Sequence, residues 1–336
     1  MRFVYFTTIL YISCFFYSCN IFNRTPNFIE VSGFIQGTTY RVVAESKNNI
    51  NLQKSIDSIF ASFDSVFNNY VPYSLISRIN SNDSTVVIHA DFLYFLEKSR
   101  YFYEITDGAF DITMAPLANA WGFGYENDTI LPNQYTIDSL LQFVGMEKIR
   151  IENNKVYKQN PHVAIIGNAI AKGYSTDVIA EFLLSHNITN FLVDVGGEMR
   201  VHGNNPQGKM WSIGINTPLE GTAYDEYSVI VSLENKSIAT SGNYRKFYMK
   251  DGEKYSHTIH PKTGYPVSHN LLSASIITDE CIDADALATA CMVVGLEKAI
   301  EIIDAHPQFQ AIFHYHKQDS LYTYISKDLE RCVVHK

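Results

Sequence analysis

Asp285 and Thr289 stand four residues apart in Asp283-Ala-Asp-Ala-Leu-Ala-Thr-Ala-Cys-Met-Val-Val-Gly295, a segment of mostly small and apolar residues. In a helix, this spacing places both side chains on one face. A carboxylate and a hydroxyl among such neighbours are poorly solvated, and a hard cation such as Mg²⁺ satisfies both. The segment also fits an ordinary helix start, with Asp283 as N-cap, Asp285 complementing the helix dipole and Thr289 bonded to the preceding turn. The segment alone favours this second interpretation.

The composition limits the class of protein. The chain has 336 residues, of which 46% are hydrophobic and 18% charged, as expected of a folded protein with one large core or two smaller ones. Its 26 basic and 35 acidic residues give a net charge of −9, and Lys and Arg form no run. This charge distribution argues against binding to a nucleic-acid backbone.

The first 19 residues form an apolar stretch behind Arg2 and end in Ser18-Cys19, which is typical of a secretory signal peptide. A cysteine directly after a small residue resembles the lipobox of bacterial lipoproteins, although Phe16 and Tyr17 replace the smaller residues usual there. We therefore expect a signal peptide over 1–18, a lipidated Cys19 and a tether over 19–27. An uncleaved N-terminal anchor is the alternative. Both place the folded part outside the cytoplasm, attached to a membrane.

Three cysteines remain in the folded part, namely Cys281, Cys291 and Cys332. Their odd number and the absence of a CxxC spacing argue against a disulfide framework or a zinc ribbon. A helix between Cys281 and Cys291 would hold these two too far apart for a bridge. We expect three ordinary thiols.

The patterning over 28–336 indicates one domain, since it contains no repeat, low-complexity tract or long linker. Alternation predicts a hairpin over 28–45 around Gln36-Gly37-Thr38, and apolar spacing predicts an amphipathic helix over 51–67. Further helices are expected from Asp91 and over about 168–185. Strands are expected over 191–195, 211–216, 229–233, 311–316 and 321–325. This order predicts an α+β fold in which a mixed or antiparallel sheet packs against helices.

Two familiar motifs are excluded. Gly203-Asn-Asn-Pro-Gln-Gly-Lys209 has the spacing of a P-loop, but Met210 stands where Ser or Thr must hold Mg²⁺, and a strand follows. His257, His260 and His269 do not predict a zinc site, because Pro261 and Gly264 prevent a helix between them. Along a strand, a spacing of three would point the first two to opposite faces.

Six further segments combine glycines, polar side chains and aromatic rings. Glycines allow close backbone approach, aromatic rings stack on a flavin or adenine, and polar groups donate to phosphate. The segments are Thr106-Asp-Gly-Ala-Phe-Asp111, Pro116-Leu-Ala-Asn-Ala-Trp-Gly-Phe-Gly124, Ala169-Ile-Ala-Lys-Gly-Tyr174, Asp194-Val-Gly-Gly-Glu198, Ala239-Thr-Ser-Gly-Asn-Tyr-Arg245 and Ser256-His-Thr-Ile-His-Pro-Lys-Thr-Gly-Tyr-Pro266.

Together with the Asp285 helix, these segments resemble the ApbE family of FAD:protein FMN transferases, in one consistent order from Gly37-Thr-Thr-Tyr40 to Gly295. The resemblance implies a single ApbE-like domain that uses Mg²⁺ and FAD to place FMN on a Ser or Thr of an acceptor protein, releasing AMP. It also implies a periplasm-facing lipoprotein whose acceptors are membrane redox-pump subunits or other exported flavoproteins. This agrees with the N-terminal segment.

The resemblance also assigns roles to residues. Asp285, Thr289 and the main-chain carbonyl of Ala169 are implied as Mg²⁺ ligands. Lys172 and His257 are implied as catalytic residues. Lys172 is placed near the pyrophosphate or near the metal-linked acidic residues, and His257 is the candidate general base for a hydroxyl nucleophile. Lys172 and His257 are also among the implied flavin-nucleotide contacts, and the others are Gly37, Thr38, Tyr70, Asp111, Trp121, Gly196, Gly197, Glu198, Ser241 and Tyr244.

Several of these residues have a structural alternative. Ala169 also fits a helix start, Lys172 a solvated surface lysine and His257 a structural histidine. Gly196 and Gly197 also fit a tight turn, and Trp121 and Phe123 also fit a core. Glu198 and Asp194 fit either adenosine contacts or structural partners.

Two residues depart from the family pattern. His260 stands where the family usually has Asp, which removes a carboxylate beside the proposed base, and Gln36 replaces a usual Met. Two rival functions follow for the same site: hydrolysis of FAD to FMN and AMP, and flavin binding by a lipoprotein without chemistry.

Overall fold

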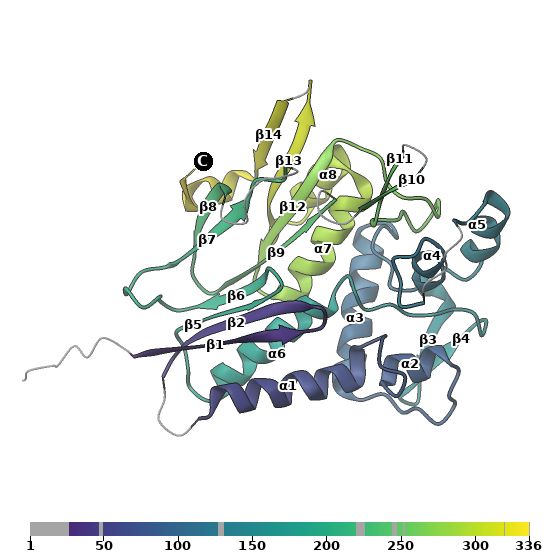
Figure 1. Cartoon of the computed structure of the whole chain (residues 1–336), viewed down its shortest axis with the longest axis horizontal. Coiled ribbons are helices and arrows are strands. Elements are labelled where there is room, and N and C mark those ends of the chain that lie inside the picture. The colour runs from purple at the N-terminus through teal and green to yellow at the C-terminus, as the bar shows by residue number, and fades with distance from the viewer. Residues whose placement is uncertain are drawn as a thin grey trace, which may run out of the picture.

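An eight-stranded sheet forms the centre of the molecule, and every neighbouring pair of its strands is antiparallel (Figure 1). The structure is a computed structural model that describes residues 27–46, 50–126, 131–219, 226–243, 247–250, 253–318 and 320–335. The strand order is β1 (Phe28–Ile35), β2 (Thr38–Glu45), β5 (Phe191–Val195), β6 (Glu198–His202), β9 (Lys236–Gly242), β12 (Leu271–Thr278), β13 (Gln310–Lys317) and β14 (Ser320–Ile325).

Helices cover one face of this sheet, and a second sheet covers the other. The helices are α1 (Leu52–Phe67), α6 (Ala171–Ser185), α7 (Cys281–Val294) and α8 (Leu296–Ala305), and α3 (Ala90–Ile105) packs against α7. The second sheet has the order β15 (Val333–His335), β8 (Tyr227–Leu233) and β7 (Trp211–Asn216). Apolar side chains fill both spaces between the layers, which gives three layers around two cores.

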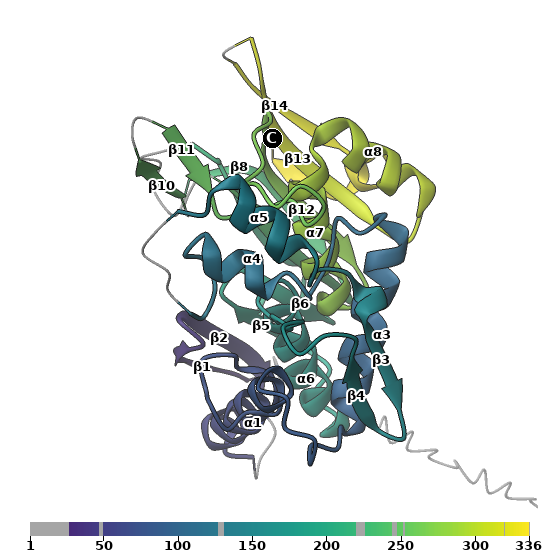
Figure 2. The ribbon, with the colours of Figure 1, turned by 90° about the vertical axis from the view of Figure 1, so that its right-hand side faces the viewer.

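Shorter elements lie beside the main layers, most of them at the right-hand end of Figure 1. They are α2 (Leu75–Asn80), α4 (Ala115–Ala120), α5 (Gln134–Leu141), η1 (Met146–Lys148), β3 (Ile149–Glu152), β4 (Lys155–Lys158), β10 (Phe247–Lys250) and β11 (Glu253–Ser256). Figure 2 shows α4 and α5 in front of β12 and α7. At the other end, η2 (Lys327–Cys332) packs against β8 and β13.

The predicted fold class, α+β with an antiparallel sheet against helices, is confirmed. The hairpin over 28–45 is formed by β1 and β2, and Gln36 (φ 53°) and Gly37 (φ 75°) make its two-residue turn. Positive φ at both turn residues is the type I′ geometry that matches strand twist. The helix over 51–67 is α1, where the Asn51 side chain accepts a hydrogen bond from the Lys54 N–H at 3.0 Å.

The strands predicted over 191–195 and 211–216 are confirmed as β5 and β7, and β8, β13 and β14 extend the other predicted strands by one or two residues. Two helix boundaries differ from the predictions. The helix expected from about 168 begins only at Ala171, and the helix expected from Asp91 begins at Ala90. None of the helices in the described part of the chain is both long and apolar enough to span a bilayer. The predicted signal peptide and Cys19 lie outside the described residues.

The three cysteines of the folded part are free thiols, as predicted. Cys281 and Cys291 are both buried within α7, and Cys332 is partly exposed at the end of η2.

Candidate active site

Close packing of α6 on α7 determines the position of Asp285. A Cβ on Gly173 would lie 2.3 Å from the Cys281 carbonyl oxygen, so only glycine fits at this contact. The Gly173 N–H donates to Oδ2 of Asp285 at 2.9 Å. The Asp285 side chain is therefore held by the first turn of a neighbouring helix, and it is 2% exposed.

The N-terminus of α7 is capped by Asp177 of α6. Its two carboxylate oxygens accept from the N–H groups of Cys281 at 3.0 Å and Ile282 at 2.8 Å. Arg200 of β6 donates to the same carboxylate at 2.9 Å. The prediction that Asp283 is the N-cap is wrong, because α7 begins two residues earlier and its capping carboxylate comes from another helix.

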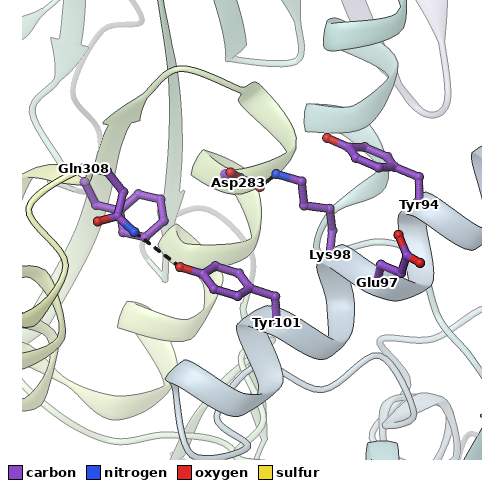
Figure 3. Close-up of a pocket in the computed structure, with 7 residues that line it drawn as sticks. Tyr94, Glu97, Lys98, Tyr101, Asp283 and Gln308 are labelled. Carbon is purple, nitrogen blue, oxygen red and sulfur yellow. Dashed lines mark hydrogen bonds and ion pairs between the residues drawn. The ribbon is translucent and has the colours of Figure 1, made fainter.

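Asp283 instead pairs with Lys98 of α3 at 2.6 Å. Figure 3 shows this pair beside a cavity of about 350 Å³ between α3 and α7, where Tyr101 accepts a hydrogen bond from Gln308. Residues two apart in a helix point about 200° apart around its axis. Asp283 and the cavity therefore belong to the side of α7 that faces away from Asp285.

Lys172, Glu198 and Asp285 form a charged cluster in which both carboxylates are buried. The Lys172 ammonium contacts Oε1 of Glu198 and lies 3.8 Å from Oδ1 of Asp285. Burial opposes the charged form of Lys172, but the Asp285 and Glu198 carboxylates more than offset this and raise its pKa. Burial raises the pKa of Glu198 to about 7 and also raises that of Asp285, while Lys172 opposes both shifts. The side chain of Lys172 is thus not the solvated surface lysine of the alternative interpretation.

Two turns that contain glycine lie next to this cluster. They are Gln36-Gly37 between β1 and β2 and Gly196-Gly197 between β5 and β6. The Gly196 N–H donates to the Thr39 carbonyl at 2.9 Å, and a Cβ on Gly196 would lie 2.8 Å from the Thr38 side chain. Gly197 (φ 100°) follows, and its N–H donates to Oδ1 of Asp194 at 2.8 Å. The β1–β2 turn and the β5–β6 turn therefore meet beside Glu198, so Thr38 and Gly196 lie close together.

The second half of α7 approaches the end of β9. The hydroxyls of Thr289 and Ser241 are 3.4 Å apart. Two residues after Ser241, Oδ1 of Asn243 accepts from the Thr258 hydroxyl at 2.6 Å. His257 precedes Thr258, and its ring lies edge-to-face with Phe123 at 6.3 Å between centroids. A chain of contacts therefore connects Thr289 to the segment that carries His257.

Ala169 lies in the loop before α6, and this loop is held by Asn69. The Asn69 side chain donates to the Ile165 carbonyl at 2.9 Å and accepts from the Gly167 N–H at 3.0 Å. Tyr70 follows Asn69 and is 62% exposed. The loop of Ala169 and the loop of Tyr70 thus lie side by side.

Trp121 and Asp111 have internal partners. Trp121 is 4% exposed and donates to the Gly264 carbonyl at 2.7 Å, so its indole packs under the 261–264 turn. Oδ1 of Asp111 accepts from both the N–H and the hydroxyl of Thr113, and burial raises the pKa of Asp111 to about 6. Their roles as flavin contacts stay predictions, and Tyr244 lies outside the described residues.

The two departures from the family pattern have structural roles. Nδ1 of His260 accepts from the Lys262 N–H at 3.1 Å, which is the bond to the residue two positions on that an Asp makes in an Asx-turn. Burial lowers the pKa of His260, and the Lys262 charge adds to this, so its ring keeps the turn but carries no negative charge. Gln36 donates to Oδ1 of Asp64 at 2.9 Å and ties the hairpin turn to α1.

The predicted Mg²⁺ ligands are a carboxylate, a hydroxyl and a carbonyl, all of them oxygen donors of the kind Mg²⁺ prefers. Among the described residues, no group of three or more His, Cys, Asp or Glu side chains converges as metal ligands. Glu198 and Asp285 nevertheless place two carboxylates against the single Lys172 ammonium, and Oε2 of Glu198 is buried without a hydrogen-bond partner. This surplus of buried negative charge fits a divalent cation, and Mg²⁺ itself stays a prediction.

Sequence reasoning missed Gly173 and Asp177, which hold α7 in place. Gly173 stood inside one of the quoted segments, but nothing in the sequence shows which backbone it must approach. Asp177 follows Gly173 by four residues, so both lie on one face of α6. This spacing is the only signal by which Asp177 could have been found.

Fold and site together define a class of protein, an α+β domain with a charged, oxygen-rich cluster between α6, α7 and β6. The chain matches the model of the ApbE family over residues 36–313. A relative from Vibrio cholerae named FAD:protein FMN transferase is 33% identical over 290 residues, covering 83% of this chain and 85% of the relative. One of the same name from Haemophilus influenzae is 34% identical over 291 residues, covering 82% and 83%.

Solved structures agree with these matches. The flavin transferase ApbE from Vibrio cholerae superposes with a TM-score of 0.82 and 31% identity, covering 91% of this chain and 99% of that chain. The flavinyl transferase ApbE from Pseudomonas stutzeri, in its apo form, superposes with a TM-score of 0.82 and 26% identity, covering 91% and 97%. The chain belongs to the ApbE family.

Proposed function

We propose that this chain transfers FMN from FAD to a Ser or Thr hydroxyl of an acceptor protein, with release of AMP and in the presence of Mg²⁺. The names of its relatives support the transferase activity. The observation that carries the proposal is the charged cluster in which Lys172 contacts Glu198 and lies 3.8 Å from Asp285, beside two glycine turns. Such a cluster combines a cation for phosphate oxygens with carboxylate oxygens for a metal.

The proposed reaction breaks the phosphoanhydride bond of FAD and forms a phosphate ester with the acceptor. The acceptor hydroxyl oxygen attacks the phosphorus on the riboflavin side of the pyrophosphate, and a new P–O bond forms. The bond from this phosphorus to the bridging oxygen breaks, and AMP leaves with that oxygen. The hydroxyl proton passes to a base. FMN is then joined to the acceptor through a phosphodiester, and no electron is gained or lost.

Residues of this chain position the reactants. The Lys172 ammonium pairs with pyrophosphate oxygens, and the backbone of Gly196 and Gly197 lets the nucleotide approach β5 and β6 closely. Asp285, Thr289 and the Ala169 carbonyl would hold Mg²⁺, which when bound neutralises charge on the pyrophosphate and on the leaving phosphate. Gly173 keeps Asp285 in place through its N–H.

His257 is the proposed base for the acceptor hydroxyl. Its segment is joined to the Thr289 side of the site through Thr258 and Asn243. Proton removal contributes less than in-line positioning in phosphoryl transfer, so a His257 variant should keep part of its activity.

We also propose that the chain is an exported lipoprotein, with residues 1–18 as signal peptide, Cys19 as the lipidated residue and 28–336 as the folded domain facing the periplasm. The apolar stretch that ends in Ser18-Cys19 supports this. The proposed acceptors are membrane redox-pump subunits or exported flavoproteins, which occupy the same compartment. Mass spectrometry of the mature N-terminus tests this, and a Cys19 without lipid would contradict the lipid anchor.

One assay separates this function from its two rivals. The purified protein is incubated with FAD, Mg²⁺ and a redox-pump subunit prepared without its flavin, and AMP is measured together with flavin fluorescence that survives denaturing electrophoresis. Transfer predicts AMP and a fluorescent acceptor band. AMP without a fluorescent band would indicate hydrolysis of FAD instead. Neither product would leave only flavin binding.

A further inference from the structure

A groove of about 410 Å³ lies between β1 and α1, outside the candidate active site. Its walls are residues 32–35 of β1, Tyr40 and one side of α1, which contributes Gln53, Asp57, Phe60, Ala61 and Asp64. Figure 1 shows β1 at the edge of the large sheet, with α1 alongside. No group of the proposed reaction lies in this groove.

The groove faces the edge of β1 and not one of its faces. Successive side chains of a strand point to opposite faces, so a pocket on one face touches every second residue. Here four consecutive residues, 32 to 35, line the groove. The backbone of β1 therefore forms its wall.

Hydrogen-bonding groups of this backbone point into the open edge. The Thr39 carbonyl accepts from the Gly196 N–H, so Thr39 faces β5 and not β1. Thr39 is opposite Phe34 in the β1–β2 register, and Phe34 therefore points its N–H and C=O away from β2. The direction of the backbone N–H and C=O alternates from residue to residue along a strand, so those of Ser32, two residues before Phe34, also point away from β2. Within the described residues, β1 has no partner strand on this side.

The opposite wall of the groove is negatively charged. Asp57 is exposed on α1, and its Oδ1 accepts from Gln53 at 2.8 Å and from the Tyr40 hydroxyl at 3.2 Å. Asp64 lies two turns further along the same helix. Neither carboxylate forms an ion pair with any residue that the structure describes, whereas Glu30 on β1 is paired with Arg41.

The groove leads to the candidate active site. Its last β1 residue, Ile35, is followed by the turn Gln36-Gly37, and Thr38 then contacts Gly196. Gln36 donates to Asp64, so one wall of the groove and the turn are tied together. A chain that follows the β1 edge therefore arrives at the glycine turns.

We propose that an extended segment of the acceptor protein binds here as an added strand on β1, with a Lys or Arg side chain beside Asp57 and Asp64. This proposal rests on the proposed transferase function. Unpaired strand edges bind extended peptides through main-chain hydrogen bonds, and side-chain pockets give the specificity. These two carboxylates, which form no ion pair within the described part of the chain, select a basic segment. Strand addition also delivers the target hydroxyl toward Thr38 without occupying the FAD site.

The test compares Ser32→Pro with Ser32→Ala in FMN transfer to the flavin-free redox-pump subunit. Proline removes the outward N–H and leaves the ladder to β2 intact, whereas alanine keeps the N–H. Without the hydrogen bond from the Ser32 N–H to the acceptor segment, the KM for the acceptor should rise about three- to tenfold in Ser32→Pro and stay unchanged in Ser32→Ala. The KM for FAD, and kcat at saturating acceptor, should not change.

A second pair of variants tests the charge. Asp57→Lys should raise the KM for the acceptor about tenfold and weaken its dependence on ionic strength, while Glu301→Gln on α8 should have no effect. If transfer is normal and the KM for the acceptor is unchanged in both Ser32→Pro and Asp57→Lys, acceptor binding in the groove is refuted, while the transferase function stands. If Ser32→Pro changes only the oligomeric state, the β1 edge pairs with a second copy of this chain. That result would also refute acceptor binding in the groove. A wild-type protein that transfers no FMN contradicts the function itself.

Discussion

The backbone N–H of Gly173 donates to the carboxylate of Asp285 at 2.9 Å, while the α-carbon of Gly173 lies against the main chain of α7. This contact joins the start of α6 to the residue that we propose holds the metal. It explains why a glycine stands directly after Lys172 in a helix, where glycine otherwise costs stability.

Replacing Gly173 with Ala should therefore damage both the fold and the reaction. The new Cβ would lie 2.3 Å from the Cys281 carbonyl oxygen, so α6 and α7 must separate. We expect a loss of about 1–3 kcal/mol in the free energy of unfolding and a fall in kcat of about 10²-fold. The control is Gly167→Ala, whose Cβ would meet its nearest atoms at 3.6 Å. Equal effects of the two variants in denaturant unfolding would contradict the packing argument.

The capping role of Asp177 gives a second prediction. Asp177→Ala leaves the N–H groups of Cys281 and Ile282 without their acceptor and removes a partner of Arg200. We expect a loss of about 2–3 kcal/mol in the free energy of unfolding. Glu181→Ala removes only the exposed partner of Arg200 and should cost less than about 1 kcal/mol. Urea unfolding of both variants measures the difference, and similar midpoints would refute the cap.

A third prediction concerns charge compensation by Lys172. Lys172→Met leaves Glu198 and Asp285 as neighbouring buried carboxylates. Because the lysine side chain is 30% exposed, we expect about 2 kcal/mol of destabilisation, below the loss for a fully buried pair. Adding Glu198→Gln should restore part of this stability in a double-mutant cycle. Additive losses in the cycle would show that the two residues are not coupled.

The hairpin and α1 could be predicted because their patterns are local. Alternation over 28–45 and the turn residues Gln36 and Gly37 determine β1 and β2. The apolar spacing over 51–67 and the Asn51 side chain determine α1. Each of these signals lies within one element.

Boundaries set by distant residues could not be predicted. α7 begins at Cys281 because Asp177 caps it from 104 residues away. The helix expected from about 168 begins at Ala171, since Asn69 holds the preceding loop in a non-helical form. β12 is buried on both faces, so its sequence does not alternate between apolar and polar residues. β9 also shows no clear alternation. The site residues were found by motif resemblance, and their contacts depend on these distant pairings.

A fourth prediction concerns acid stability. His314 is fully buried between the hydroxyls of Ser228 and Ser273, and burial lowers its pKa to about 4 from 6.5. As the pH falls, His314 is protonated at a higher pH in the unfolded chain than in the folded protein. The folded state therefore has its full stability above pH 6.5 and loses stability as the pH falls toward 4. The loss should approach about 3 kcal/mol. Unfolding of His314→Gln should be less pH-dependent in this window, and unfolding of the exposed His316→Gln should follow the wild type. An unchanged slope in His314→Gln would contradict this assignment.

The most direct measurement compares Asp285→Asn with Asp283→Asn, two residues apart on opposite sides of α7. AMP released and flavin bound covalently to the acceptor are measured together at saturating FAD and Mg²⁺. Our account predicts a one-to-one ratio in the wild type, loss of both products in Asp285→Asn and retention of both in Asp283→Asn. Wild-type levels of AMP and covalent flavin in Asp285→Asn would contradict the assignment of this cluster as the site of FMN transfer.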